Sequence, residues 1–105
     1  MNVQALVGWN VARLRIKMKM SQSELAKSCG WVDQAYISGL ENGRRNPTAI
    51  LLYVVSSALG VQVGELFSTI GAPAMFLDGP VKMKNTESRR RKMPGNESAQ
   101  DVTWL

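Results

Sequence analysis

The chain has 105 residues, which is enough for one domain with a modest core and leaves little room for a separate catalytic domain. Its 13 Lys and Arg against 8 Asp and Glu give a net charge of +5, which suits an anionic partner such as nucleic acid or an acidic membrane surface. The single cysteine excludes an intramolecular disulfide, and the absence of histidine excludes His-based acid–base chemistry, so we expect no metal, no cofactor, no catalytic residue and no enzyme.

Nothing in the sequence predicts a membrane segment. The first ten residues lack a basic region leading into an apolar core, so they do not resemble a signal peptide. The longest apolar run, residues 49–55, is far shorter than the roughly 20 residues that a spanning helix needs. We therefore expect a cytoplasmic protein without a membrane partner.

The first predicted helix is amphipathic. Val3, Val7, Val11, Leu14 and Met18 recur at spacings of three and four, which places them on one apolar stripe. This spacing predicts that all five side chains face the core.

Two further helices are predicted from local capping signals. Residues 21–24 have the S-x-x-E pattern of a capping box, which predicts a helix from there to about Ser28, stopped by Gly30. A third helix would hold Ile37 and Leu40 inward and end at residues 42–43.

A basic turn at residues 44–47 precedes a predicted fourth helix, capped by Thr48 or Asn46 and ended by Gly60. The inward face of this helix is expected to hold three aliphatic residues, Leu52, Val55 and Leu59. Residues 63–67 would form a short fifth helix at most. Because no strand-like alternation is present, the fold class is predicted to be all-α, a compact bundle of five short helices.

The composition changes after the predicted bundle. From residue 69 onward Gly, Pro, Ser and charged residues dominate without an apolar period, which predicts a domain at 1–68 and a largely disordered extension at 69–105. An apolar island at 74–77 would dock on the bundle, pair across a dimer, or do neither. Six positive charges against one negative charge between residues 82 and 92 indicate either an auxiliary DNA arm or solvated charge.

Several sequence pieces occur together in a familiar order. They are GWNVARLR at 8–15, SQSELA at 21–26, YISGLENG at 36–43, NPT at 46–48, ALG at 58–60 and ELF at 65–67. In this order and spacing they resemble the phage-repressor-like (lambda-repressor-like) helix-turn-helix family, also called the XRE family. The resemblance implies that the helix at 22–28 crosses the backbone of double-stranded DNA and that the next helix enters the major groove.

The turn between these two helices is one residue longer than the family pattern. The buried aliphatic residue of the family comes six residues after the turn glycine, whereas Ile37 comes seven after Gly30. The extra residue therefore lies at 30–32, and Asp33 becomes the N-cap of the third helix. One of Trp31 and Val32 is expected to fill the apolar slot of the turn, and the other to lie at the surface or at a crossing chain.

With this register, the resemblance implies which residues face the bases: Gln34, Ala35, Tyr36 and Gly39. Gln34 is the best candidate for direct readout, because glutamine pairs in a bidentate manner with adenine, and the alternative is a solvated polar residue. Gly39 would either bring the helix backbone close to the groove or relieve crowding against another helix. Tyr36 would either give its hydroxyl to a phosphate or pack on Leu40.

The resemblance also implies phosphate contacts, which we expect from Gln22, Ser38, Arg44, Arg45, Asn46 and Thr48. Gln22 could additionally contact and orient Gln34, and the two arginines could instead be plain solvated charge. Arg15 and Glu41 occupy positions that often form a buried or partly buried ion pair in this family, the alternative being simple surface charge.

These expectations describe a sequence-specific transcriptional regulator that binds double-stranded DNA, most simply a repressor acting as a homodimer on a two-fold operator. The sequence does not separate a phage, a restriction–modification or a toxin–antitoxin context. In the antitoxin case residues 69–105 would bind a protein partner. The alternative from another functional class is an interaction adaptor that kept the fold and lost DNA binding.

Overall fold

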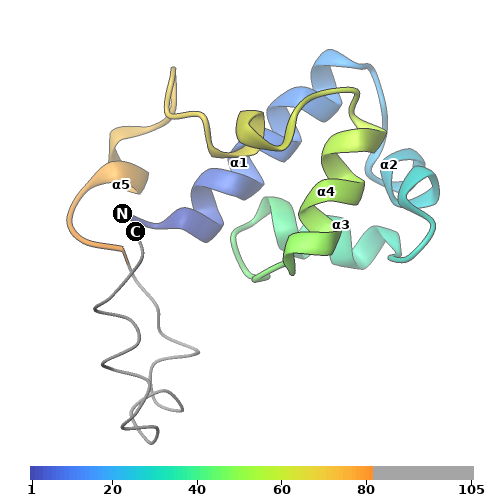
Figure 1. The fold of residues 1–105 in the computed structure, drawn as a ribbon, viewed down its shortest axis with the longest axis horizontal. Coiled ribbons are helices and arrows are strands. Elements are labelled where there is room, and N and C mark those ends of the chain that lie inside the picture. Colours follow the sequence, from blue (N-terminus) through green and yellow to red (C-terminus); the bar gives the residue numbers. More distant parts are fainter. Residues whose placement is uncertain (82–105) are drawn as a thin grey trace, which may run out of the picture.

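The computed structural model describes residues 1–81, and Figure 1 shows how their helices are arranged. Four α-helices of eight or more residues lie in this part of the chain: α1 (Val3–Lys17), α2 (Gln22–Cys29), α3 (Gln34–Glu41) and α4 (Ala49–Ala58). A 3-10 helix, η1 (Val63–Phe67), and a four-residue helix, α5 (Ala74–Leu77), follow. The predicted disordered part of the tail and its DNA arm, at 82–105, lie outside the described residues.

The all-α class holds for residues 1–81, which contain no strand, but the predicted fifth bundle helix does not form as an α-helix. Residues 63–67 make a single 3-10 segment whose flanking bonds span three residues, from Glu65 N–H to the Gln62 carbonyl and from Ser68 N–H to the Glu65 carbonyl. A short segment that includes a glycine can adopt the tighter 3-10 form, in which each hydrogen bond spans three residues. Within residues 1–81, no helix is long and apolar enough to cross a membrane.

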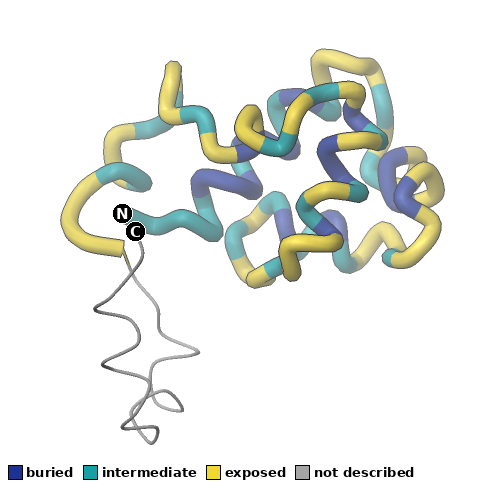
Figure 2. Tube along the Cα trace, viewed as in Figure 1, coloured by how far each residue is buried: buried dark blue, intermediate teal, exposed yellow. Residues whose placement is uncertain are grey.

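The core lies between α1, α3 and α4 and is closed by α2 and η1 (Figure 2). Its most buried large side chains come from five elements: Val11, Leu25, Ile37, Leu40, Val55, Leu59 and Leu66. Cys29 is buried among them, as a small apolar group. The predicted inward faces of α1 and α3 are therefore largely confirmed.

Two predicted core positions are wrong by one or two residues. Met18 is 50% exposed, because α1 ends at Lys17 and the chain then turns through Lys19, whose φ is +61°. Met20 packs against the core in its place. In α4 the fully inward residue at the first turn is Leu51, and Leu52 is only partly buried.

A close helix crossing and a buried amide fix α1 in the bundle. A Cβ on Gly8 would lie 2.1 Å from the Leu40 carbonyl oxygen, so glycine allows α1 and α3 to meet backbone to backbone. Asn10, fully buried, donates from Nδ2 to the carbonyl oxygens of Leu66 at 3.0 Å and Ser68 at 2.9 Å. This amide holds the end of η1 against α1.

The apolar island at 74–77 docks on the bundle. It forms α5, which lies beside the start of α1 (Figure 1), and the Asn2 N–H donates to the Phe76 carbonyl at 2.7 Å. The Met1 ammonium donates to the carbonyl oxygens of residues 78–80. Residues 69–81 therefore return to the N-terminal end of α1, while the division of the chain at residue 68 stays a prediction.

Candidate nucleic-acid interface

The long turn between α2 and α3 places its extra residue at the surface. Gly30 caps α2 in the left-handed region with φ of +77°, a conformation that glycine adopts without steric cost. Val32 then packs against the core, whereas Trp31 is 68% exposed. The Asp33 carboxylate accepts from the Tyr36 N–H at 2.9 Å, so the predicted N-cap is confirmed.

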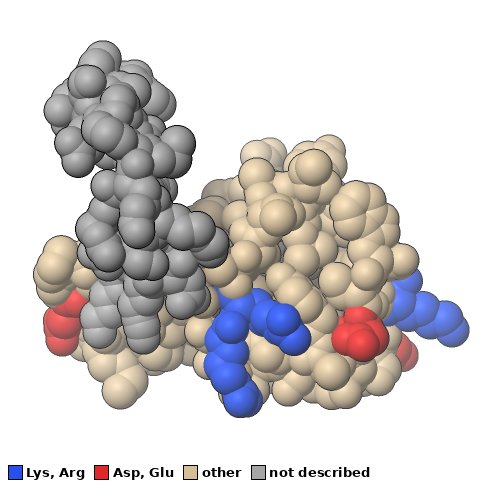
Figure 3. Space-filling view, turned by 90° about the horizontal axis from the view of Figure 1, so that it is seen from below, with Lys and Arg blue, Asp and Glu red and all other residues tan. Residues whose placement is uncertain are grey.

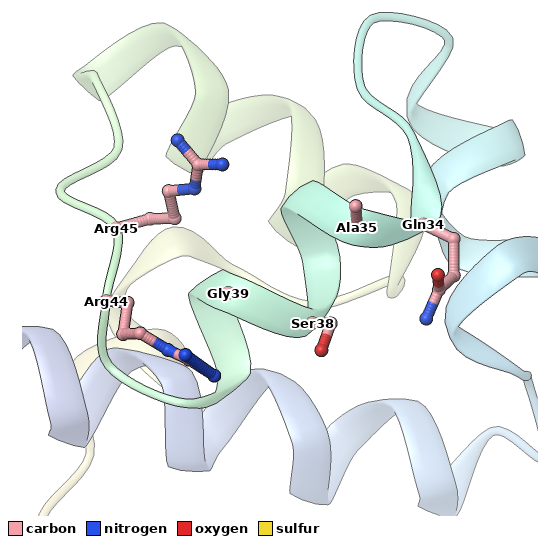
Figure 4. Close-up of a pocket in the computed structure, with 6 residues that line it drawn as sticks. All are labelled: Gln34, Ala35, Ser38, Gly39, Arg44 and Arg45. Carbon is pink, nitrogen blue, oxygen red and sulfur yellow. The ribbon is translucent and has the colours of Figure 1, made fainter.

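The outer face of α3 is open and shallowly hollowed. Ile37 and Leu40 hold the opposite face in the core, which leaves Gln34 and Ala35 exposed and Ser38 and Gly39 half-buried. These four residues and two arginines line a depression of about 480 Å³ (Figure 4): Gln34, Ala35, Ser38, Gly39, Arg44 and Arg45. Six of the residues singled out from the sequence therefore meet on one surface.

A chain of hydrogen bonds runs from the start of α3 back to α1. Gln34 Nε2 donates to Gln22 Oε1 at 2.6 Å, and Gln22 Nε2 donates to Glu41 Oε1 at 2.9 Å. Arg15 completes the chain with bonds from Nε to Glu41 Oε2 at 2.6 Å and from Nη2 to Oε1 at 3.0 Å. Gln22 thus contacts Gln34 directly.

The direction of this chain follows from the carboxylate at its inner end. Because an ionised carboxylate only accepts, Gln22 must turn its N–H toward Glu41 and its Oε1 toward α3. Gln34 must then donate to Gln22, which leaves its own Oε1 and its second N–H for a ligand. Glu41 therefore determines which polar atoms Gln34 presents.

The ion pair at the inner end is largely buried. The side chains of Arg15 and Glu41 are 14% and 7% exposed, and Arg15 Nη1 also donates to the Met20 carbonyl at 2.9 Å. The hydrogen bond to Glu41 and the attraction of its charge raise the pKa of Arg15, against desolvation, which lowers it. Arg15 is thus held as a permanent cation between α1 and α3.

Arg44 and Arg45 diverge on the two sides of Gly39. Figure 4 shows the Arg44 side chain on the side of α3 that carries the Ser38 hydroxyl, and the Arg45 side chain on the other side. The Arg45 guanidinium lies over the ring of Tyr36, 4.9 Å from its centroid. The two adjacent arginines therefore have different surroundings.

Tyr36 is half-buried beneath Arg45 and packs against the core. Desolvation raises the pKa of its hydroxyl, and the charge of Arg45 opposes this shift. A Cβ on Gly39 would lie 3.2 Å from Arg45 Nε and 3.3 Å from its Cγ, so the missing side chain makes room for Arg45 rather than for another helix.

Asn46 and Thr48 are exposed in the loop before α4 but do not line the depression. The Thr48 hydroxyl accepts from the Leu51 N–H at 3.1 Å and is the N-cap of α4. Sequence reasoning missed Gln4, whose Nε2 donates to the carbonyl oxygens of Arg45 at 3.0 Å and Gly43 at 3.4 Å. No local pattern marks it, because its partners lie about forty residues away.

The face that carries α3 bears positive charge. Figure 3 views the molecule from the side on which α3 lies in Figure 1, and a group of Lys and Arg side chains occupies the middle of this face. Such a surface suits an anionic ligand with a convex backbone. Among residues 1–81 no three His, Cys, Asp or Glu side chains are grouped as a metal site would require.

Comparison with known proteins places this geometry in a family. A family model described as helix-turn-helix matches residues 11–66. An uncharacterized HTH-type transcriptional regulator, y4dJ, from Sinorhizobium fredii is 48% identical over 66 residues, which cover 63% of this chain and 84% of the relative. The control protein C.BamHI from Bacillus amyloliquefaciens is 41% identical over 73 residues, covering 67% of this chain and 89% of the relative.

A solved structure agrees with these sequence matches. The restriction-modification controller protein C.AhdI from Aeromonas hydrophila superposes with a TM-score of 0.58 at 31% identity, covering 61% of this chain and 91% of that protein. The predicted resemblance is therefore confirmed at the level of family and fold.

Proposed function

This chain belongs to the XRE-type helix-turn-helix family of DNA-binding transcriptional regulators, and from that premise we propose that it is a controller of the restriction–modification type. It reads a two-fold operator as a homodimer and acts as a repressor without enzymatic activity, in the cytoplasm where the DNA is. The observation that carries the proposal is the exposed face of α3, on which Gln34 is fixed by Gln22 at the start of the helix, while Arg44 and Arg45 lie at its other end.

In this proposal α3 lies in the major groove with Gln34 as the principal reader. Its free carbonyl oxygen and N–H match the donor and acceptor pair on the major-groove edge of adenine. Ala35 is small enough to let the helix backbone approach the bases. The phosphate contacts come from the edges of this face: Gln22, Ser38, Arg44, Arg45, Asn46 and Thr48.

The homodimer is proposed to form through the outer face of α4. Ile50 and Tyr53, one turn apart, are 62% and 65% exposed, an unusual pair of large apolar side chains on a surface. Half-sites one helical turn apart require the two copies of α3 to face the same side of such a dimer. Tyr53→Glu is expected to shift the protein from dimer to monomer in sedimentation equilibrium.

Repression is the simplest direction of regulation for such a dimer. A protein bound at an operator blocks a promoter by occupancy alone, whereas activation needs a further contact with the transcription machinery. A reporter promoter that carries the operator should therefore lose activity when the protein is expressed. An increase in reporter activity would contradict this part of the proposal.

The proposal is tested by selecting random duplex DNA with the full-length protein at about 150 mM salt and sequencing what is recovered. We expect an inverted repeat with half-sites about one turn apart. Gln34→Ala should lose discrimination at one or two base pairs of each half-site, whereas Gln62→Ala, an exposed glutamine at the start of η1, should leave the motif unchanged. Recovery of no motif by a folded protein would refute sequence-specific recognition.

A further inference from the structure

We propose that Tyr36 is a positioning residue that orders the Arg45 guanidinium, and that the missing side chain of Gly39 leaves the space that the Arg45 side chain occupies. This inference rests on the proposed function, because the bound ligand is the phosphate backbone of duplex DNA. In this inference Tyr36 and Gly39 act on Arg45 and not on the bases, which the sequence had predicted them to face. It also gives Arg45 an ordered side chain that Arg44 lacks.

Arg45 is held at three points along its length. The Gln4 amide donates to the backbone carbonyl of Arg45 at 3.0 Å. The Arg45 side chain lies in the space left by Gly39, where a Cβ would be 3.2 Å from Nε and 3.3 Å from Cγ. The centroid of the Tyr36 ring lies 4.9 Å from the guanidinium carbon of Arg45. These contacts come from α1 and α3, both parts of the rigid bundle. Arg44, its neighbour, has no contact with an aromatic ring among the described residues.

The Arg45 guanidinium lies over the ring face and donates no hydrogen bond within residues 1–81, so its N–H groups are free. One planar edge of Arg45 is therefore available to a pair of phosphate oxygens at the side of α3. An arginine that is already ordered loses less conformational entropy on binding than a solvated one. The stack should therefore strengthen binding without touching DNA itself.

The ring rather than the hydroxyl of Tyr36 carries this role, so phenylalanine is the matched substitution. We expect Tyr36→Phe to bind the selected operator with affinity within about two-fold of wild type, whereas Tyr36→Leu should weaken it by about two- to five-fold. Gly39→Ala should weaken binding in the same direction, since the Arg45 side chain would have to move by a few tenths of an ångström to accommodate the Cβ. Arg45→Ala should lower the slope of log affinity against log salt by about one phosphate contact.

The coupling is measured by a double-mutant cycle at a fixed salt concentration. In an Arg45→Ala background, Tyr36→Leu and Gly39→Ala should have no further effect, while in an Arg44→Ala background both should keep their full effect. Thermal unfolding of every variant controls for folding. If Tyr36→Leu still weakens binding without Arg45, or if Tyr36→Phe is as weak as Tyr36→Leu, Tyr36 contacts DNA itself and the inference is wrong.

A second measurement uses the free protein and does not depend on DNA binding. The ring current of Tyr36 should move the NMR signals of the Arg45 side-chain protons upfield of those of Arg44. This displacement should persist in Tyr36→Phe and vanish in Tyr36→Leu. Equal signals for the two arginines would overturn the inference even if operator binding is found, and an upfield Arg45 would support the stack even if the operator proposal fails.

Discussion

Replacing Glu41 by alanine should be among the most destabilising single changes in the α1–α3 contact. The Glu41 carboxylate accepts two hydrogen bonds from Arg15, at 2.6 and 3.0 Å, and one from Gln22 at 2.9 Å. Its side chain is 7% exposed and that of Arg15 is 14% exposed. Truncation therefore leaves a cation in a site from which water is largely excluded.

The magnitude follows from this burial. Removing one partner of a buried ion pair costs roughly 3–5 kcal/mol of unfolding free energy, because the remaining charge loses its compensation. Arg15 keeps one bond to the Met20 carbonyl and some access to solvent, so we expect the lower end, about 3 kcal/mol. For a domain of this size, that corresponds to a fall in Tm of about 12–24 °C.

The assay is thermal and urea unfolding followed by circular dichroism at 222 nm. Glu65→Ala is the matched control, because Glu65 pairs with Arg13 at 3.8 Å while the two side chains are 53% and 34% exposed. Loss of such an exposed pair should cost below about 1 kcal/mol. High salt should abolish the Glu65 effect and leave most of the Glu41 effect.

The double substitution Arg15→Met with Glu41→Leu distinguishes two causes of the stability loss in Glu41→Ala: the unpaired charge of Arg15 and the lost packing of the Glu41 side chain. It should recover most of the stability lost in Glu41→Ala, since apolar replacement of a whole buried pair is often neutral or stabilising. A loss in Glu41→Ala no larger than that in Glu65→Ala would refute the reasoning. So would a double variant that is no more stable than Glu41→Ala.

Three further changes test the packing and the extent of the fold. Gly8→Ala should cost at least about 3 kcal/mol or abolish folding, because its Cβ would lie 2.1 Å from the Leu40 carbonyl oxygen, while Gly64→Ala, with open space around it, should be nearly neutral in the same urea titration. Burial raises the pKa of the Cys29 thiol, so the folded state favours the neutral thiol and loses stability as pH rises through the folded pKa. Alkylation of Cys29 at pH 8 should therefore be slow until urea unfolds the chain. Rapid alkylation of the folded protein would contradict its burial. A chain of residues 1–81 keeps every contact described above and should melt within about 3 °C of the full chain, a shift well under 1 kcal/mol, and a larger fall would place stabilising contacts in the remainder.

The features that could be predicted from sequence are those set by local chemistry. Ser21, Asp33 and Thr48 each accept a backbone N–H at a helix start. The sequence pattern places the first two and leaves Thr48 or Asn46 for the third, because a cap needs only the next three residues. The register of α3 followed from the position of Ile37 after Gly30, and it made Asp33 the N-cap. Gly30 as the end of α2 was equally visible, because the left-handed region favours glycine.

The errors occur where the path of the backbone beyond a helix decides which residue turns inward. Met18 continues the apolar spacing of α1, but the chain leaves the helix at Lys17 and Met20 becomes the core residue. The choice between Trp31 and Val32 likewise depended on the direction in which the chain leaves Gly30. Periodicity gives no information at such positions, because it assumes that the helix continues.

Contacts made by the loop between α3 and α4 could not be predicted from the sequence, for a related reason. The stack of Arg45 on Tyr36 requires the irregular conformation of residues 42–48, and the Gln4 amide supports that loop from an element about forty residues away. A residue-type pattern records that an arginine follows the helix but not where its side chain lies. Only the folded backbone distinguishes Arg45 from Arg44.

In this proposal α1 makes no base contact, but it determines the geometry on both sides of α3, the helix that does. On one side Arg15 fixes Glu41, which orients Gln22 and through it Gln34. On the other side Gln4 fixes the backbone of Arg45. Since Gly8 lets α1 lie directly against α3, the same contact that contributes core stability also determines the direction of the polar groups on the reading face.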